Sequence, residues 1–328
     1  MNINPLFYSP TAEGTWTGRN DGSDADVQRW HQRIILIDLL AEDLPDLTDK
    51  KGIALIGFAC DEGVRRNGGR TGAKEGPLQI RKACGSLPAH FDEEIILIDL
   101  GDIICDNTEM DQAQLALSAM IKYVLKSGYR PMVIGGGHEV AYGHYKGIKE
   151  YSGLEAQIGI INFDAHFDMR RPNENGYNSG TGFLQIANDC QMEKKPFRYL
   201  PIGIQQNSNT KQLFDLAAAL KVSYIPAEQF MPLQQEQIFH KIQHFIDESS
   251  AIYLTICMDV FSAAAAPGVS AQAYNGLFPD PFFFHCLQTI LSSGKVISSD
   301  IAEYNPTYDI NQSTAKLAAA LVFKMVTR

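Results

Sequence analysis

Short apolar runs alternate with amphipathic stretches along most of the chain. The apolar runs are rich in Ile, Val and Leu, as buried strands are, and they cover 53–60, 95–99, 130–137, 158–163, 198–204, 252–258 and 295–302. The stretches between them predict a helix that begins at Pro77 and further helices over 26–40, 109–126, 211–220, 235–248, 282–292 and 311–327. Strands that alternate with helices predict an α/β fold, in which one parallel sheet has helices on both faces.

The same alternation also fits an eight-stranded α/β barrel, which is the competing architecture. The chain has 328 residues, and neither an internal repeat nor a linker divides it. We therefore expect one α/β domain over 1–328, since α/β domains of this size often stay single. Residues 1–26 are polar and rich in Gly, Asn, Ser and Thr, so they are expected to form an irregular N-terminal arm.

Two carboxylates and an imidazole follow the central apolar run, Ile158–Phe163. Asp164, His166 and Asp168 stand at i, i+2 and i+4, and alternate side chains of an extended chain point the same way. This donor set suits a divalent cation such as Mn, Fe or Zn. The alternative interpretation is a polar loop with a capping Asp, and it is weaker because buried charges need partners or a metal.

Three further apolar runs end in the same kinds of residue. His138 follows VIGGG, Asp259 follows LTICM and Glu303 follows SSDIA. In open α/β sheets, ligands bind outside the carboxyl ends of the strands, so these four strand ends predict one metal-binding site. Cys257 lies two residues before Asp259 and is expected to face the same way, unless it is an ordinary buried cysteine.

The remaining candidates are weaker. His240 and His244 are spaced i, i+4 on a predicted helix, but the Glu of HExxH is absent, so they are interpreted as solvated or packing histidines. His144 is expected in the wall of the site. The arginines of 65–70 either form a surface cluster or seal the glycine-rich loop around them. Ser179 has no adjacent His or Lys base, which argues against a nucleophile.

Composition narrows the choice of partners. Hydrophobic residues make up 45% of the chain and charged residues 20%, which is ordinary for a globular protein. A net charge of -10 argues against a nucleic acid or an anionic membrane as partner. The N-terminus lacks the pattern of a signal peptide, and no apolar stretch is long enough to span a bilayer. The six cysteines are scattered without a CxxC, so we expect reduced thiols and a cytoplasmic location.

Taken together, the motifs resemble those of the arginase/agmatinase (ureohydrolase) superfamily. The matching segments run from Asn67 to Pro306 and read NGGRTGAKEGP, GGGHE, NFDAHFDMR, SGTGF, DVFSAAAAPGVSA and DIAEYNP. The form of GGGHE, the arginine of DAHFDMR and DVFSAAAAPGVSA look most like the formimidoylglutamase branch. The resemblance implies an arginase-like three-layer α/β/α fold with one mainly parallel sheet of roughly eight strands. By analogy it also implies a homo-oligomer.

The resemblance implies two Mn²⁺ ions per subunit, bridged by hydroxide. Matched by motif, the ligands would be His138, Asp164, His166, Asp168 and Asp259, with Asp164 shared by both ions. The family usually has D-x-D where this chain has Cys257-Met258-Asp259. A thiolate is a soft ligand that suits Zn or Fe better than Mn, so the hypothesis is a weakened second site, a shifted metal preference or reduced activity.

By the same resemblance the reaction is hydrolysis of a linear amidine, N-formimidoyl-L-glutamate, to L-glutamate and formamide in histidine degradation. A metal centre lowers the pKa of water towards about 7 and supplies the hydroxide that attacks the formimidoyl carbon. Glu303 would pair with the cationic amidinium, and Asp168 would hold the hydroxide. Arg170 is placed to bind a substrate carboxylate, or else is a structural arginine. Ser179 is the second expected contact of this dicarboxylate substrate.

Three alternatives stay open. Another ureohydrolase, such as an agmatinase or guanidinobutyrase, is one, although Arg170 argues against agmatine because agmatine has no carboxylate. Arginase is disfavoured because arginases have His at the position of Ser179. A metal-poor, catalytically impaired homologue is the second alternative, and Cys257 is the residue that favours it. The third alternative is a metal-dependent deacetylase-like hydrolase. The glutamate of E-x-N-P argues against it, because this glutamate indicates a cationic amidine as substrate.

Overall fold

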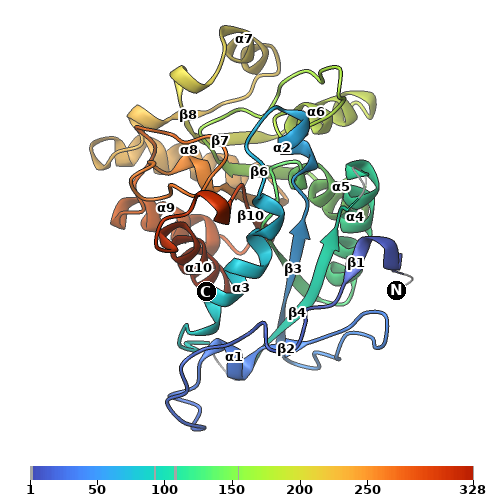
Figure 1. Cartoon of the computed structure of the whole chain (residues 1–328). Helices are drawn as coiled ribbons and strands as arrows, with labels where there is room; N and C mark the ends of the chain where they lie inside the picture. The colour runs from blue at the N-terminus through green and yellow to red at the C-terminus, as the bar shows by residue number, and fades with distance from the viewer. Residues whose placement is uncertain (1–2, 92–93, 107–108, 154, 328) are drawn as a thin grey trace.

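A single twisted sheet runs through the molecule (Figure 1). The computed structural model describes residues 3–91, 94–106, 109–153 and 155–327. The sheet is ten-stranded in the order β1-β4-β3-β5-β10-β9-β6-β7-β8, with β2 paired to β4. Its strand pairs are parallel except for β1 with β4. The sheet is open, so the barrel alternative is wrong and the predicted arginase-like sheet is confirmed.

The long strands coincide with the apolar runs of the sequence. They are β3 (Lys51–Ala59), β4 (Ile95–Ile104), β5 (Tyr129–Ile134), β6 (Ile158–Phe163), β7 (Tyr199–Ile204), β9 (Ala251–Cys257) and β10 (Val296–Ala302). Three strands have only two residues each: β1 (Tyr8–Ser9), β2 (Ile35–Leu36) and β8 (Ile225–Pro226). These short strands lie towards the ends of the sheet, where periodicity gives little signal because a two-residue run is too short to show it.

Helices cover both faces of the sheet and bury its apolar side chains in two clusters. One cluster draws on α3 (Gly76–Gly85), α8 (Gln235–Asp247), α9 (Pro281–Ser292) and α10 (Ser313–Val326). The other draws on α4 (Met110–Lys126), α5 (Val140–Ser152), α6 (Gly182–Met192) and α7 (Lys211–Ala219). The predicted three-layer α/β/α arrangement is therefore confirmed (Figure 1). No helix within the described ranges combines the length and the apolar character that a bilayer span requires.

The helix predicted over 26–40 is wrong. Only α1 (Trp30–Arg33) is helical there, and β2 follows it. Residues Ile34 and Ile35 are β-branched, which favours extended chain, and the buried indole of Trp30 anchors the segment against Phe91. Tertiary packing thus determines the conformation of this segment and outweighs its apparent helical periodicity.

Helix α5 was not predicted because its glycines lower helix propensity. The structure shows what they do. A side chain at Gly143 would come within 2.6 Å of the carbonyl oxygen of Gln114 on α4. A side chain at Gly147 would come equally close to the carbonyl oxygen of Ser118. Close contact between the two helices therefore requires these glycines.

Two segments outside the regular elements also pack against the sheet. In the expected N-terminal arm, η1 (Pro5–Phe7) and β1 are the regular elements, and the Trp16 indole is buried and donates to Asp99 at 2.7 Å. The glycine-rich segment after β3 contains α2 (Glu62–Arg66) and a 3-10 turn over Ala73–Glu75. This second segment reaches the carboxyl edge of the sheet, where the candidate site lies.

Candidate active site

Four adjacent strands end side by side at the carboxyl edge of the sheet. Register pairs Ile301 with Ile134 between β10 and β5, Ala302 with Cys257 between β10 and β9, and Phe163 with Ile256 between β6 and β9. The next few residues of each strand therefore enter one small volume. This is the convergence that the sequence predicted from the strand ends.

The segment after β6 turns sharply. Asp164 accepts a hydrogen bond from the His166 backbone N–H at 2.7 Å and from the Asn162 side chain at 3.1 Å. Asp168 has φ 47, the left-handed region that non-glycine residues seldom occupy. The three predicted residues do meet, but through a turn in the chain and not through the extended conformation that was expected.

His138 reaches the same volume through a glycine turn after β5. Gly135 and Gly136 both have φ 80, which a residue with a side chain would adopt only under strain. The His138 Nδ1 atom lies 3.0 Å from a carboxylate oxygen of Asp164 and 3.0 Å from one of Asp168. Its Nε2 atom lies 3.0 Å from the Thr255 hydroxyl, which fixes the ring with Nδ1 towards the carboxylates.

His166 makes the link to the next strand end. Its Nδ1 atom lies 3.2 Å from the carboxylate of Asp259, on the 3-10 turn η6 (Met258–Val260), and 3.5 Å from that of Asp164. Two groups of ligand-type atoms result, each within 4.8 Å: His138, Asp164 and Cys257, and Asp164, His166 and Asp259. Asp164 belongs to both groups, so it is placed to bridge two cations.

The charges of this cluster favour a cation. Burial raises the pKa of Asp259, and burial followed by the nearby Asp164 carboxylate raises that of Asp168. Burial alone would lower the pKa of the His138 imidazole, but Asp164 and Asp168 outweigh it and hold this pKa well above its usual value. The Asp259 Oδ1 atom is buried, and it has no hydrogen-bond partner among the described residues. Divalent cations satisfy such nitrogen and oxygen donors and offset the repulsion of the carboxylates, so these residues fit a metal centre.

A cavity of about 380 Å³ opens onto this cluster and is lined by His166, Asp168 and Asp259. Glu303 lines it too, and its carboxylate accepts from the His138 backbone N–H at 3.0 Å. Burial, then the nearby Asp259 and Glu139, raise the pKa of Glu303 well above its usual value. Glu303 has φ 64, so both of the predicted catalytic carboxylates sit on left-handed backbone. Backbone strain of this kind clusters at functional sites.

Arg170 and Ser179 line the same cavity. The Arg170 side chain lies across Gly180, where an added Cβ would meet its Cδ at 3.0 Å, and the Arg170 backbone donates to the Gly180 carbonyl at 2.8 Å. The Ser179 hydroxyl accepts a hydrogen bond from the Asn67 side chain at 3.2 Å. The structure thus places all three predicted substrate contacts, Glu303 included, in the wall of one cavity.

Sequence reasoning missed Asn67 and Thr255. Thr255 lies two residues before Cys257 on β9, so strand alternation alone indicated its direction. Asn67 lies in the glycine-rich segment, which is held by Arg70: this side chain donates to the carbonyls of Ser270 at 2.8 Å and Val269 at 2.6 Å. Of the two alternatives left open for the arginines of 65–70, Arg70 therefore shows the second, since it seals the segment.

His144 is not part of the cavity wall, so that expectation is wrong. Its ring is buried and lies 2.6 Å from the Asp300 carboxylate and 2.5 Å from the Ser298 hydroxyl. Tyr253 donates to the same carboxylate. Two residues of β10 and one of β9 thereby fasten α5 to the sheet, behind the carboxyl edge.

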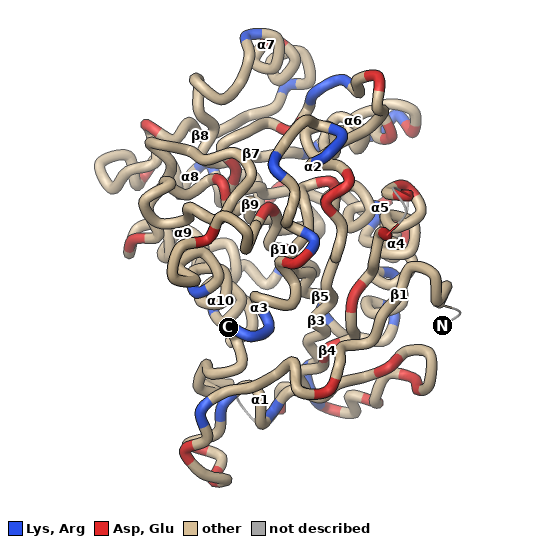
Figure 2. The backbone as a smooth tube through the Cα atoms, viewed as in Figure 1, with Lys and Arg blue, Asp and Glu red and all other residues tan. Residues whose placement is uncertain are grey.

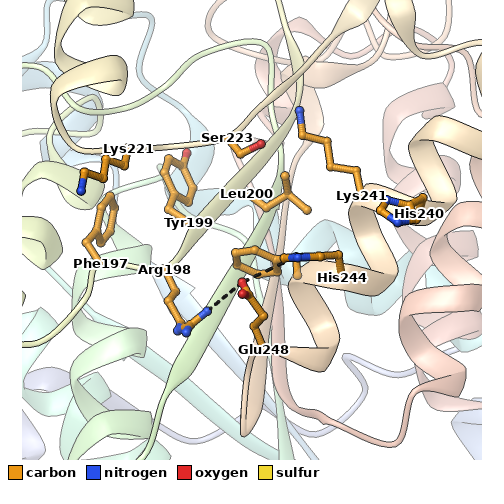
Figure 3. A pocket seen from close by; sticks show the side chains of 11 residues that line it. Phe197, Arg198, Tyr199, Leu200, Lys221, Ser223, His240, Lys241, His244 and Glu248 are labelled. Carbon is orange, nitrogen blue, oxygen red and sulfur yellow. Dashed lines mark hydrogen bonds and ion pairs between the residues drawn. The ribbon is translucent and has the colours of Figure 1, made fainter.

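A larger cavity of about 480 Å³ lies near the opposite edge, at the start of β7 (Figure 3). Its wall includes the basic side chains of Arg198, Lys221 and Lys241, and Arg198 donates to Glu248 at 3.3 Å. His240 and His244 also line it and are exposed to solvent. Neither ligand-type group found among the described residues includes a residue of this cavity. The catalytic candidates are therefore those at the carboxyl edge of the sheet. Figure 2 shows that acidic and basic positions are spread over the whole backbone.

Comparison with known proteins decides the family. The Arginase family matches residues 51–327. The chain belongs to the arginase family. A formimidoylglutamase of Clostridium tetani is 42% identical to this member over 98% of the chain and 96% of its own length. A formimidoylglutamase of Geobacillus thermodenitrificans is 45% identical over 96% of the chain and 95% of its own length.

Solved structures show the same fold. The formimidoylglutamase of Bacillus subtilis superimposes with a TM-score of 0.79 at 23% identity, over 94% of both chains. The formiminoglutamase of Trypanosoma cruzi, solved with Mn²⁺, gives 0.73 at 23% identity over 87% of this chain and 98% of that one. These structures thus show that the chain has the arginase fold, in agreement with its open, mainly parallel sheet.

Proposed function

We propose that this protein is a metal-dependent hydrolase that converts N-formimidoyl-L-glutamate and water to L-glutamate and formamide. One observation carries the proposal: Glu303 and Arg170 line the cavity that also exposes His166, Asp168 and Asp259. The Glu303 carboxylate matches the amidinium at one end of this substrate, and the Arg170 guanidinium matches a carboxylate at the other end. Full-length relatives at 42% and 45% identity are formimidoylglutamases, which supports the same substrate.

The proposed metal is Mn²⁺, in two positions that share Asp164. His138, Asp164, His166, Asp168 and Asp259 would hold it. When bound, the metal supplies a nucleophile at neutral pH by lowering the pKa of water towards about 7. Support comes from the nitrogen and oxygen donors of the cluster and from the T. cruzi formiminoglutamase, which was solved with Mn²⁺.

Glu303 would orient the amidinium of the substrate. The hydrogen bond from the His138 backbone fixes one carboxylate oxygen, and the side chain lies in the cavity wall. A cationic amidinium would donate to this carboxylate by charge-assisted hydrogen bonds and would offset the cost of burying it. Asp168 would accept and return the proton during attack on the formimidoyl carbon, since its carboxylate faces the same cavity.

Arg170 and Ser179 would bind the glutamate carboxylates. The guanidinium of arginine matches a carboxylate in bidentate geometry. The Ser179 oxygen already accepts from Asn67, so its own hydrogen is free to donate to a carboxylate. Arg170 also lines an adjoining cavity of about 340 Å³, which offers room for the glutamate part of the substrate.

The proposal is tested by offering Mn-loaded protein three substrates in parallel. We expect formamide from N-formimidoyl-L-glutamate and no urea from agmatine or L-arginine. Urea release as the faster reaction would contradict the proposal and favour another ureohydrolase. Absence of turnover in folded, metal-loaded protein would favour the impaired homologue.

We further propose that the enzyme acts in the cytoplasm and assembles as a homo-oligomer. The proposed cytoplasmic location rests on the reduced, scattered cysteines of the sequence. The proposed homo-oligomer rests on analogy with the family.

A further inference from the structure

Cys257 stands among charged side chains and not in an ordinary apolar core. It is the last residue of β9, and it is 1% exposed. Its sulfur lies within 4.8 Å of donor atoms of His138 and Asp164. It also lies near the Asp259 carboxylate, on which it acts to lower the pKa against the larger raising effect of burial. The sulfur therefore faces both of the groups that could hold a cation.

Two other buried cysteines of the chain have different surroundings. Cys84 and Cys286 belong to the apolar cluster formed by α3, α8, α9 and α10. Neither is among the ligand-type groups of the described residues. Packing alone explains those two thiols, whereas a thiol beside an imidazole and two carboxylates needs another explanation.

The two cation positions of the cluster differ in donor chemistry. Asp164, His166 and Asp259 offer oxygen and nitrogen, which suit Mn²⁺. His138, Asp164 and Cys257 offer nitrogen, oxygen and sulfur, and sulfur suits Zn²⁺, Fe²⁺ or Co²⁺ better than Mn²⁺. A cation that binds there replaces the thiol proton, which leaves to solvent, and the metal–sulfur bond forms without any change of oxidation state.

We propose that Cys257 is a metal ligand through its thiolate, so that the two positions of this centre prefer different metals. The position of His138 then prefers a thiophilic divalent cation over Mn²⁺, although Mn²⁺ in excess can still occupy it, and the position of His166 keeps Mn²⁺. The inference deepens the proposed function, because it assumes a metal centre at this edge. It does not depend on which amidine is hydrolysed.

Cobalt substitution tests the sulfur ligand without any assay of activity. Metal-free protein is titrated anaerobically with Co²⁺, and the near-ultraviolet absorption is followed for a thiolate-to-cobalt charge-transfer band. We expect the band in the parent and in Cys286→Ser, a matched control for a buried cysteine outside the site. We expect its loss in Cys257→Ser and Cys257→Asp. A band of equal strength in Cys257→Ser, or no band in the parent with Co²⁺ bound, would overturn the proposal.

Competition between metals tests the difference in preference. Parent and Cys257→Asp are equilibrated with equal Mn²⁺ and Zn²⁺, and the metal content of the protein is measured after desalting. The variant should have a zinc-to-manganese ratio lower than that of the parent by about tenfold or more. An unchanged ratio contradicts the proposal.

A folding defect is separated by thermal melting of each variant, and Cys257→Ser provides the second, nearly isosteric change. If Cys257→Asp fails to fold, the cobalt band and the metal ratio of Cys257→Ser decide the question. If the parent shows the cobalt band but does not turn over formimidoylglutamate, the proposed function fails and this inference stands. If the parent turns over formimidoylglutamate but shows no cobalt band, the proposed function stands and this inference fails.

Discussion

Arg170 is the residue whose proposed role is most specific to the substrate. Replacing it with Met keeps the aliphatic part of the side chain over Gly180 and removes the guanidinium. We expect Arg170→Met to raise KM for N-formimidoyl-L-glutamate by about tenfold or more with a smaller change in kcat, since a lost ground-state contact raises KM. Arg19→Met, at an exposed arginine that lines neither of the two cavities that Arg170 lines, is the control and should leave KM unchanged. Equal KM in Arg170→Met and the parent would exclude the role.

Glu303 is expected to act on the other end of the substrate. Glu303→Gln keeps the shape and the hydrogen bond from the His138 backbone but removes the charge that pairs with the amidinium. We expect kcat/KM to fall by about a hundredfold, as for loss of one charge-assisted contact in a buried site. Glu193→Gln, at an exposed carboxylate paired with Lys149, is the control and should leave kcat/KM unchanged. A variant Glu303→Gln with the parent's kcat/KM would remove Glu303 from the reaction.

Among the elements, α3 is joined to the sheet by a buried ion pair. The Arg81 guanidinium is 1% exposed and donates to Asp99 at 2.8 and 2.9 Å and to Asp102 at 2.6 Å. Arg81→Leu would leave the carboxylates without their cation, so we expect the free energy of unfolding to fall by about 3–5 kcal/mol. Urea denaturation measures this, and Lys82→Leu at the exposed neighbour should change it by less than about 0.5 kcal/mol. Equal loss in both variants would contradict the assignment.

Sequence patterns predicted the elements where one period dominates. The strand over Ile158–Phe163 has the same bounds in the sequence prediction and in the structure, because a fully buried strand appears in the sequence as a continuous apolar run. Helix α5 was missed because the reason for its glycines lies on α4, a partner that the sequence does not reveal. The left-handed backbone at Asp168 and Glu303 was also beyond prediction, since only glycine marks such positions in a sequence.

The candidate site was predictable for a different reason. His138, Asp164, Asp259 and Glu303 each follow a strand, and parallel strands bring their carboxyl ends to one edge. The hydrogen bond between Asn67 and Ser179, at 3.2 Å, was not predictable, because it joins two loops that are far apart in the chain. Residues placed by strands are thus inferred more readily than residues placed by loops.

At the scale of the whole molecule, a net charge of -10 is combined with a buried cluster of carboxylates at one edge of the sheet. A cation bound there stabilises the folded state by about 2.7 kcal/mol when its concentration is a hundred times its Kd. We therefore expect removal of metal by a chelator to lower Tm by several degrees, measured by calorimetry. The same chelator should change the Tm of Asp259→Asn less. An unchanged Tm in the parent would argue against a metal centre.

The most direct measurement is the release of formamide and L-glutamate from N-formimidoyl-L-glutamate by the purified, Mn-loaded protein, with Asp164→Asn alongside. Asp164 belongs to both ligand groups, so its loss affects both cation positions. The account predicts equimolar products from the parent and a rate lower by about a thousandfold or more in the variant. No formamide from the parent, or similar rates in both proteins, would contradict it.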